Sequence, residues 1–453
     1  MKNIAFHNLG CKVNSYELDA MKQIAQEKGY NIVDFAQKAD IYVVNTCTVT
    51  NIADRKSRQM LHRAKAQNPD AVVVAVGCYV NHGLEDPAQD AAVDLCIGNN
   101  RKKDLITIIE EYLANRSVQD AVVDIATQQS YEELQIEDSE EHTRAYIKIE
   151  DGCNQFCAYC AIPLARGRVR SRKKEQILAE VRALAARGFH EVVLTGIHLS
   201  SYGLDFLGIQ SAEYQDAARA GLLAQVMEEI AAVPGIERIR LGSLEPRIIT
   251  EEFAQRISRI PQLCPHFHLS LQSGANATLK RMNRQYTAED FAIGAAILRK
   301  YFPRVAITTD VIVGFPGETE EEFEESKAFI EQISFYELHV FRYSRRKGTV
   351  ADRMKEQVPE DIKALRSDAL ITLDAQASKN YRAWYLGKEM ELLLEEEQEI
   401  LGRTYLVGYT KDYVRGAVPI EEAKKAGIGE GDICTLICRD FMTDEILLCD
   451  TIS

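Results

Sequence analysis

Three cysteines in one short run are the residues of this chain best suited to chemistry. Cys153, Cys157 and Cys160 stand in the run Asp-Gly-Cys-Asn-Gln-Phe-Cys-Ala-Tyr-Cys, with a C-x3-C-x2-C spacing. This spacing offers three thiolates to one metal centre and omits a fourth. A structural zinc site closes with four protein ligands, whereas an iron–sulfur cluster held by three cysteines keeps one iron free for a small molecule. The spacing therefore favours an iron–sulfur centre that does chemistry.

The same run resembles the cysteine loop of the radical S-adenosylmethionine superfamily, whose open iron is chelated by the amino and carboxylate groups of the cofactor. The resemblance implies a [4Fe-4S] cluster and S-adenosylmethionine as cofactors. The alternatives are a zinc half-site or a redox-sensitive surface loop. Both explain poorly why one predicted strand, at 145–150, is followed by all three thiols together.

A second set of cysteines consists of Cys11, Cys47 and Cys78, each of which directly follows a predicted strand. In an open α/β sheet, ligands bind outside the carboxyl ends of the strands, so three thiols at such ends can converge on one centre. Gly10 and Gly77 would let the backbone turn tightly beside the sulfurs. We predict a second three-cysteine cluster here; the alternative is three buried thiols that fill a core.

The fold class predicted from the pattern is α/β, beginning with a doubly wound parallel sheet in residues 1–126. The stretch 127–143 loses periodicity and gathers acidic residues, which indicates a solvated acidic linker and a domain boundary. The acidic residues of this stretch are Glu132, Glu133, Glu137, Asp138, Glu140 and Glu141. The first domain has predicted strands at 4–8, 41–44, 72–76 and 93–97 and predicted helices at 15–28, 52–66 and 101–113.

A second series of strands and helices occupies residues 144–384 and favours a partial (βα)6 barrel, open on one side, which admits a large substrate. The cysteine loop follows the first of these strands, so it lies at the carboxyl ends, where barrel active sites gather. Residues 385–453 show short strands with turns, typical of a small antiparallel β-barrel. The central strands are predicted at 145–150, 191–195, 238–242, 267–272, 305–313 and 337–343.

Length and composition limit the classes of function that this chain can have. A chain of 453 residues should hold two or three domains. Its net charge of −14 argues against binding polyanions over the whole surface, so a nucleic-acid partner must use local patches. No secretory segment opens the sequence, and the most apolar run, 71–77, is too short to span a bilayer, so we expect a cytoplasmic protein without membrane contact. Eleven cysteines then indicate metal sites and buried thiols rather than disulfides.

With two three-cysteine sets and this order of domains, the chain resembles the methylthiotransferases, whose auxiliary cluster handles sulfur. The motifs Gly-Cys-Lys-Val-Asn at 10–14 and Asn-Thr-Cys-Thr-Val-Thr at 45–50 are similar to those of the bacterial branch that acts on N6-threonylcarbamoyladenosine in tRNA. The isopentenyl-adenosine branch typically has Gly-Cys-Gln-Met-Asn, and the ribosomal-protein branch Gly-Cys-Pro-Lys-Asn. The C-terminal barrel resembles the TRAM RNA-binding domain.

The resemblance implies addition of a methylthio group to C2 of the modified adenosine, with two [4Fe-4S] clusters and two molecules of S-adenosylmethionine. One methylates sulfur at the auxiliary cluster, and the other is cleaved reductively to start radical chemistry. The implied partners are a tRNA anticodon arm carrying N6-threonylcarbamoyladenosine and a low-potential electron donor, and no catalytic residue beyond the cluster ligands is required. Isopentenyladenosine or a ribosomal-protein aspartate as substrate, and a non-catalytic iron–sulfur RNA-binding protein, remain as alternatives.

Several strand ends are candidates for binding the cofactor. Gly196, in Leu-Thr-Gly-Ile-His, stands where radical enzymes of this type carry a glycine-rich strand end that meets the methionine amine, but the common Gly-Gly-Glu wording is absent. Ser243, Gln272 and Gly314 also end predicted strands, and Tyr159 neighbours the third cysteine. For each of them, a turn or an aromatic filler is the competing interpretation.

Basic residues bunch after the cysteine loop and at two later places, 280–284 and 345–347, and in an acidic chain this placement favours contact with RNA phosphates. The remaining cysteines (Cys96, Cys264, Cys434, Cys438 and Cys449) and histidines (His7, His198, His266 and His268) are interpreted as packing or hydrogen-bonding residues. The predicted nucleic-acid contacts are Arg166, Arg168, Arg170, Arg172, Lys173 and Lys174, with Lys411, Tyr413 and Arg415 in the C-terminal barrel.

Overall fold

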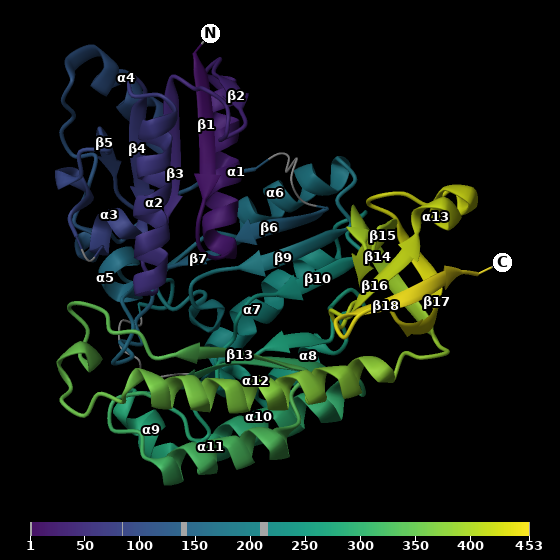
Figure 1. Ribbon diagram of the computed structural model, residues 1–453. Helices are drawn as coiled ribbons and strands as arrows, with labels where there is room; N and C mark the ends of the chain where they lie inside the picture. The colour runs from purple at the N-terminus through teal and green to yellow at the C-terminus, as the bar shows by residue number, and fades with distance from the viewer. Residues whose placement is uncertain (1, 84, 137–142, 209–215, 453) are drawn as a thin grey trace.

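A five-stranded parallel sheet, in the order β2-β1-β3-β4-β5, forms the N-terminal part of the computed structural model (Figure 1). The structure describes residues 2–83, 85–136, 143–208 and 216–452. All residues of β3 and β4 are buried, as expected for central strands covered on both faces. The strands are β1 (Asn3–Asn8), β2 (Asn31–Val33), β3 (Ile41–Thr46), β4 (Val72–Gly77) and β5 (Leu95–Ile97).

Helices cover both faces of this sheet. Leu18 of α1 (Lys12–Glu27) and Ile109 of α4 (Leu105–Asn115) belong to one buried cluster, and Leu61 of α2 (Asn51–Gln67) belongs to a cluster on the other face. The predicted doubly wound arrangement is therefore present. The short strand β2 was missing from the sequence prediction, because three residues carry too little periodicity to be recognised.

The central region contains two three-stranded parallel sheets, β10-β9-β6 and β11-β12-β13. Isolated parallel bridges, Ile239↔Leu263 and Leu244↔Leu269, join them edge to edge. Along the joined layer the strands therefore follow one another in chain order. They are β6 (Arg144–Lys148), β9 (Glu191–Thr195), β10 (Arg238–Leu241), β11 (His266–His268), β12 (Ala306–Val313) and β13 (Glu337–Arg342).

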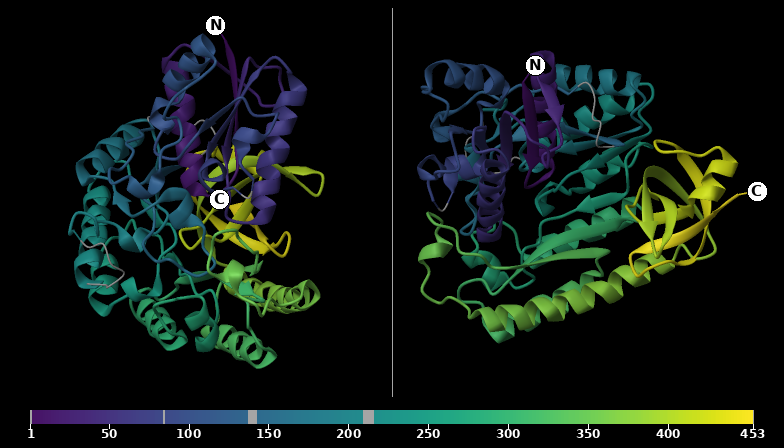
Figure 2. Two further views of the ribbon diagram at one scale, coloured as in Figure 1. Left: turned by 90° about the vertical axis from the view of Figure 1, so that its left-hand side faces the viewer. Right: turned by 45° about the horizontal axis from the view of Figure 1, so that its top comes forward.

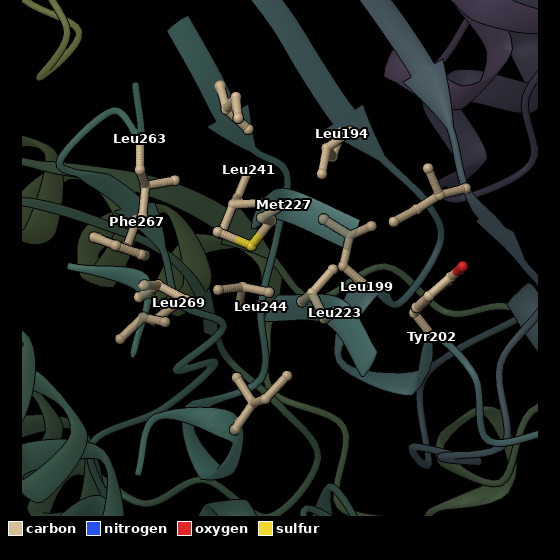
Figure 3. Packing of buried hydrophobic residues seen from close by; sticks show 14 of the residues in the cluster. Leu194, Leu199, Tyr202, Leu223, Met227, Leu241, Leu244, Leu263, Phe267 and Leu269 are labelled. Carbon is tan, nitrogen blue, oxygen red and sulfur yellow. The ribbon is translucent and has the colours of Figure 1, made fainter. Parts of the chain in front are cut away.

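Each central strand has one apolar and one polar face. Leu194, Leu241 and Phe267 pack with Leu223 and Met227 of α7 (Asp216–Ala231), as Figure 3 shows. Neighbouring residues of a strand point to opposite sides, so the residues between them face away from the helices, and we call that side the inner face. The inner face carries Arg144, Lys148, Glu191, Arg238, Arg240, His266, His268, Asp310 and His339.

The helices that cover the outer side of the central sheets alternate with the strands along the chain, as Figure 1 shows. A two-stranded ribbon of β7 (Glu150–Asp151) and β8 (Arg170–Ser171) brackets the cysteine loop. The helices are α6 (Lys174–Ala186), α7, α8 (Glu251–Ile257), α9 (Asn276–Arg281), α10 (Ala288–Tyr301), α11 (Glu320–Ile333) and α12 (Glu360–Ala383).

A closed five-stranded barrel ends the chain, in the order β14-β15-β16-β18-β17 (Figure 2). The expected small barrel is present, but it is not wholly antiparallel, because β16 and β18 pair in parallel. The helix α13 (Ile420–Ala426), which the sequence prediction lacked, lies between β16 and β17. The strands are β14 (Glu389–Ile400), β15 (Arg403–Tyr409), β16 (Arg415–Pro419), β17 (Ile433–Phe441) and β18 (Ile446–Thr451).

The stretch expected to be a solvated linker packs instead against the core where the structure describes it. Leu134 and Ile136 are buried, and the hydroxyl of Tyr16 on α1 donates a hydrogen bond to the carbonyl of Leu134 at 2.5 Å. Glu132 is also buried, and its carboxylate accepts a hydrogen bond from the backbone of Lys103. Burial of these two apolar side chains fixes the segment against the core, although its acidic composition favours exposure to solvent. Residues 137–142, which hold four of the six acidic residues of this stretch, lie outside the described residues.

Within the described ranges, no helix is both long enough and apolar enough to cross a membrane.

Candidate metal centres and a cavity beside the C-terminal barrel

Cys11, Cys47 and Cys78 lie at the carboxyl ends of β1, β3 and β4, and the structure brings them together. Gly10 and Gly77 have φ angles of +117° and +98°, which side-chain-bearing residues rarely adopt. A Cβ on Gly10 would come within 3.1 Å of the Cβ of Cys47, so glycine allows the first turn to approach the second cysteine. The predicted convergence of the three strand ends is present.

The thiols of this first set disfavour one another's ionisation. Burial and then the nearby Cys78 raise the pKa of Cys47 to about 12. Cys11 is an exposed residue as a whole, yet burial of its thiol also raises the pKa of that thiol. Three thiolates this close need positive charge between them. An iron–sulfur cluster supplies such charge and deprotonates its ligands on binding, so the donor set fits a cluster.

Cys153, Cys157 and Cys160 form the second set, in the loop after β7. The backbone N–H of Cys153 donates to the carbonyl of Gly167 at 3.1 Å, and that of Cys160 donates to the carbonyl of Cys157 at 3.0 Å. Burial, followed by the other two thiols, raises the pKa of Cys153. The guanidinium of Arg284 donates to the sulfur of Cys157 at 3.0 Å. The loop therefore presents three sulfurs and one fixed cation, which again suits a thiolate-bound cluster.

Arg166, on the short helix α5 (Ile162–Arg166), connects the two sets of cysteines. Its Nε donates to the sulfur of Cys78 at 3.2 Å, and one terminal nitrogen donates to Glu17 at 2.9 Å and to Asp151 at 3.1 Å. Its side chain is fully buried. Lys148 also binds both carboxylates, at 2.7 Å each. The predicted contact between Arg166 and RNA is therefore wrong, because this arginine ties α1 to the cysteine loop.

Removal of Arg166 should destabilise the whole protein. An Arg166→Ala variant leaves the carboxylates of Glu17 and Asp151 buried with one cationic partner fewer, which typically costs about 3–5 kcal/mol. Anaerobic urea unfolding of both proteins should measure that loss. Arg166→Lys is the matched control and should lose less, because it keeps the charge but not the planar fork. Unchanged unfolding midpoints for Arg166→Ala would contradict the linking role.

Other predicted RNA contacts are also occupied by protein. Arg172 pairs with Glu180 and with Glu133, and Arg170 is buried and donates to the carbonyl of Arg166 at 2.9 Å. These two predictions are wrong because Arg170, on β8, and Arg172, directly after that strand, both point into the protein. Lys174, Lys411 and Arg415 are half-buried beside carboxylates, whereas Arg168 and Lys173 are exposed.

Glu150 is a functional candidate that the sequence analysis missed. Its carboxylate is buried next to the cysteine loop, and one oxygen accepts a hydrogen bond from the backbone of His198 at 2.7 Å. The other oxygen has no hydrogen-bond partner among the described residues. A Cβ at Gly196 would come within 2.8 Å of the first oxygen, so glycine there admits the carboxylate. The signal available in the sequence was that a glutamate ends the strand predicted at 145–150, just before the cysteine loop.

Glu150 should make stability depend on pH. Burial raises its pKa from 4.5 to about 8. Because the folded-state value lies above the unfolded one, the contribution to stability is full below pH 4.5 and is lost as pH rises through 8. Replacing Glu150 by Gln should remove a fall of about 3 kcal/mol between about pH 5 and about pH 7.5, measured by urea unfolding of the cluster-free protein. Parallel pH profiles for the two proteins would refute this.

The other cofactor candidates lie in different surroundings. Tyr159 is close enough to Cys157 and Cys160 for their charges to raise its pKa after burial does, and its ring packs edge-on against Phe315 at 6.3 Å. Gln272 is buried with a φ of +70°. The candidate binding glycine Gly314 also has a φ of +70°, and a Cβ there would meet Lys363 at 2.2 Å.

Ser243 is the remaining cofactor candidate, and it is exposed just beyond β10.

The other cysteines behave as expected where they are buried. Cys264, Cys438 and Cys449 are inaccessible to solvent, and the free cysteines Cys438 and Cys449 lie opposite each other on β17 and β18. These thiols belong to the core.

Three inner-face residues form a cluster that single-sequence spacing did not indicate. His268, Asp310 and His339 come from three adjacent strands, and one ligand-type atom of each lies within 4.8 Å of the others. The Nε2 of His268 is 3.3 Å from an oxygen of Asp310, and its Nδ1 is 3.0 Å from the hydroxyl of Thr308. Their spacing along the chain is long and irregular, so only strand register brings them together.

A cavity of about 860 Å³ lies between β13, α12 and the C-terminal barrel. His339, Tyr409, Tyr413 and Arg415 are among the residues that line it. This volume is within the usual range for small-molecule and cofactor sites, about 300–1,000 Å³. The inner face is therefore bordered by open space at its β13 edge.

Comparison with known proteins identifies two regions of the chain. Residues 147–330 match the Radical SAM superfamily, and residues 3–98 match a family described as "Uncharacterized protein family UPF0004". The solved structure of the radical S-adenosylmethionine methyltransferase TsrM from Kitasatospora setae is similar, with a TM-score of 0.57 and 15% identity, over 77% of this chain and 74% of that one. This likeness shows a shared fold alone.

Two curated relatives are similar over nearly their whole length. Both are named "Threonylcarbamoyladenosine tRNA methylthiotransferase MtaB". The protein from Bacillus subtilis (strain 168) is 43% identical over 92% of this chain and 90% of its own length. The protein from Aquifex aeolicus (strain VF5) is 40% identical over 89% of this chain and 95% of its own. The chain therefore belongs to the radical S-adenosylmethionine methylthiotransferases.

Proposed function

We propose that the protein adds a methylthio group to C2 of N6-threonylcarbamoyladenosine beside the anticodon of tRNA. The observation that carries the proposal is the convergence of two separate three-thiol sets, each lacking a fourth ligand, in a chain at least 40% identical to two relatives named for this reaction. An open position at each centre suits chemistry with a small molecule rather than a structural role. A tRNA substrate places the reaction in the cytoplasm.

Two [4Fe-4S] clusters are proposed, one held by Cys11, Cys47 and Cys78 and one by Cys153, Cys157 and Cys160. Bound clusters and S-adenosylmethionine supply the methyl group, the sulfur handling and the reductive radical chemistry, with electrons from a low-potential donor. Arg166 and Arg284 donate hydrogen bonds to one sulfur of each set. Such donors stabilise thiolate charge and tune cluster potential.

Glu150 is proposed to bind the ammonium group of S-adenosylmethionine. Its raised pKa reflects a carboxylate that burial keeps from ionising, and a cation beside it would restore the charge. The unpartnered oxygen offers an acceptor at the position where Gly196 leaves room. Tyr159, Gln272, Gly314 and Ser243 remain proposed neighbours of the same cofactor.

The domain assignment follows from these roles. We assign residues 1–126 to the auxiliary-cluster domain, 127–143 to the connecting segment and 144–384 to a partial (βα)6 barrel for radical chemistry. Residues 385–453 are assigned to a TRAM-like domain that contacts RNA. Lys411 and Arg415 remain candidates for that contact, although carboxylates lie near both.

Arg168 and Lys173 are the proposed phosphate contacts near the cysteine loop, because both are exposed. The guanidinium of Arg168 lies over the ring of Phe156 at 4.3 Å, and Phe156 is itself 42% exposed on the loop between Cys153 and Cys157. This pair combines a cation with an aromatic surface. Both features occur in single-stranded RNA sites.

An Arg168→Ala variant should bind tRNA more weakly at moderate salt and flatten the logarithmic salt slope by about 0.7–0.9 for one lost phosphate contact. Its iron content should stay unchanged, since Arg168 touches neither set of sulfurs within hydrogen-bond distance among the described residues. Fluorescence anisotropy over a salt series measures the slope. Arg259→Ala, another exposed arginine, is the control. An unaltered slope would remove Arg168 from the interface.

Nucleoside mass spectrometry of tRNA from cells with and without this protein tests the proposed function. The 2-methylthio form of N6-threonylcarbamoyladenosine should disappear from cells that lack the protein and return on complementation. Loss of methylthiolated isopentenyladenosine would move the protein to another branch of the family, as would loss of a methylthiolated aspartate from peptides of the ribosomal proteins, measured by peptide mass spectrometry of the same cells. An unchanged set of modifications, together with no cleavage of S-adenosylmethionine in vitro, would support a non-catalytic RNA-binding protein.

A further inference from the structure

His268, Asp310 and His339 form a group of ligand-type side chains that belongs to neither set of cysteines. Two imidazoles and one carboxylate are donors that divalent transition-metal ions take in proteins. One donor atom of each residue lies within 4.8 Å of the other two. Three protein ligands are also the number that a zinc site with an open position uses. The group therefore has the composition of a metal site.

Strand pairing holds the three residues on one face of the sheet. Asp310 on β12 is the register partner of His339 on β13. His268 on β11 is the register partner of Thr308, which lies two residues before Asp310 on β12. Residues two apart on a strand point to the same side, so the three side chains share the inner face. A site built on strands is held more precisely than one built on loops.

The separation of His268 and Asp310 suits a shared ion better than a hydrogen bond. The Nε2 of His268 is 3.3 Å from a carboxylate oxygen of Asp310. A charge-assisted hydrogen bond between nitrogen and oxygen is typically about 2.7–2.9 Å long. Two ligands of a tetrahedral zinc ion, each about 2.1 Å from the metal, lie about 3.4 Å apart. The pair is thus already spaced as two ligands of one ion.

Thr308 orients His268 for this role. Its hydroxyl oxygen is 3.0 Å from the Nδ1 of His268, which leaves Nε2 for an ion. A metal-bound histidine almost always donates its other ring N–H to a fixed acceptor, and the Thr308 hydroxyl is such an acceptor. The ring of His339 lies 5.5 Å from that of His268 at an interplanar angle of 23°. Because His339 is exposed, its side chain has room to turn the third donor toward the other two.

The charges around Asp310 also leave a place for a cation. Among the described residues, the carboxylate of Asp310 forms an ion pair with His268 alone. Arg382, Lys379 and Arg415, which line the adjoining cavity, each pair with a different carboxylate. Within the described part of the chain, no arginine or lysine therefore neutralises Asp310. A divalent cation at the three donors would do so.

The cavity gives an ion access to the three donors. His339 lines the space of about 860 Å³ between β13, α12 and the C-terminal barrel. An ion held by three side chains keeps a position open for water or for an oxygen of a bound molecule. That open position would face the cavity.

We propose that His268, Asp310 and His339 bind a divalent transition-metal ion, with Thr308 as the residue that orients His268. Zn²⁺ and Fe²⁺ share this donor chemistry, and the general order of affinities favours Zn²⁺. The site is separate from the two proposed clusters, and it does not depend on which substrate the enzyme modifies.

The test uses the full chain with both clusters reconstituted, so that the thiols of the two sets are occupied. Anaerobic equilibrium dialysis against Zn²⁺, followed by metal analysis, should show about one zinc ion per chain at saturation. X-ray absorption at the zinc edge should show nitrogen and oxygen ligands. Absence of bound zinc, or sulfur ligands on the zinc that binds, would overturn the proposal.

Competition with Fe²⁺ then distinguishes the two ions. The Fe²⁺ is added at the same concentration as the Zn²⁺, and the bound zinc is measured again. Retention of zinc would assign zinc to the site. Its displacement by Fe²⁺ would assign iron to the same three ligands.

His339→Gln is the first variant, because an exposed residue is replaced without disturbing the core. It should weaken zinc binding by more than about a hundredfold, since loss of an orienting partner alone typically costs about 10–100-fold. Asp310→Asn should lose as much, and Thr308→Val should lose about 10–100-fold. His62→Gln is the matched control, because His62 lies 2.9 Å from Asp90 but belongs to no three-ligand group among the described residues.

Iron and sulfide contents are measured for every variant, so that a lost cluster is distinguished from a lost zinc site. His62→Gln should bind zinc as the unaltered protein does. Unchanged zinc affinity in both His339→Gln and Asp310→Asn would disprove the site and leave His268 and Asp310 as a structural pair. An equal loss in the His62→Gln control would show that the zinc binds elsewhere.

Discussion

Replacing Cys153, Cys157 and Cys160 together with Ala should leave about half of the iron and abolish cleavage of S-adenosylmethionine. Anaerobic reconstitution of the unaltered chain should give about eight irons and eight sulfides, since each cubane holds about four of each. The variant loses every protein ligand of one centre and none of the other. One set lies at the ends of strands in the N-terminal sheet and the other in the loop after β7, and Arg166 joins Cys78 of the first set to Asp151, two residues before Cys153.

Iron analysis and detection of 5′-deoxyadenosine with dithionite measure this result. Cys434→Ala is the matched control, because that thiol is half-buried in the C-terminal barrel, away from both sets. It should keep all of the iron and the cleavage activity. Production of 5′-deoxyadenosine by the triple variant would show that the radical centre lies elsewhere.

Replacing Cys47 with Ala should abolish methylthio transfer and leave reductive cleavage of S-adenosylmethionine in place. The two remaining thiols of its set cannot hold a cubane as three do, and so the iron content should again fall by about half. The loop of Cys153, Cys157 and Cys160 keeps its own backbone hydrogen bonds, which do not involve Cys47. The variant therefore separates sulfur handling from radical formation.

Mass spectrometry of the RNA product and of 5′-deoxyadenosine checks both halves of this expectation. Cys96→Ala, on β5 of the same sheet, is the control and should form full product. If the Cys47 variant also formed full product, Cys11, Cys47 and Cys78 would be core thiols. Loss of both activities would mean that the two centres depend on each other for assembly.

The basic run after the cysteine loop shows where composition misleads. In the sequence it is a row of cations, and a row of cations in an acidic chain favours phosphate contact. In the structure Arg166 at the end of α5, Arg170 on β8 and Arg172 just after that strand point inward, where the carboxylates of Glu17, Asp151 and Glu180 pair with them. Only Arg168 and Lys173 of the run are exposed. Exposure depends on which side of a strand a residue faces and on what packs there.

The sequence by itself determined the two three-cysteine sets, the doubly wound sheet and the order of the central strands. These features are local: a cysteine after a strand lies at that strand's carboxyl end, and parallel strands bring such ends to one edge. Hydrophobic patterning is also a local feature of the sequence, and it placed β3, β4 and β12 correctly.

Only the tertiary structure decided which polar groups meet. Glu150 fits against Gly196, His268 joins Asp310 and His339, and Arg238 pairs with Glu391 of the C-terminal barrel, although tens or hundreds of residues separate the members of each group. Strand register and the docking of the C-terminal barrel create these contacts. Both depend on the packing of the whole core rather than on any local pattern, so single-sequence spacing carries no signal for them.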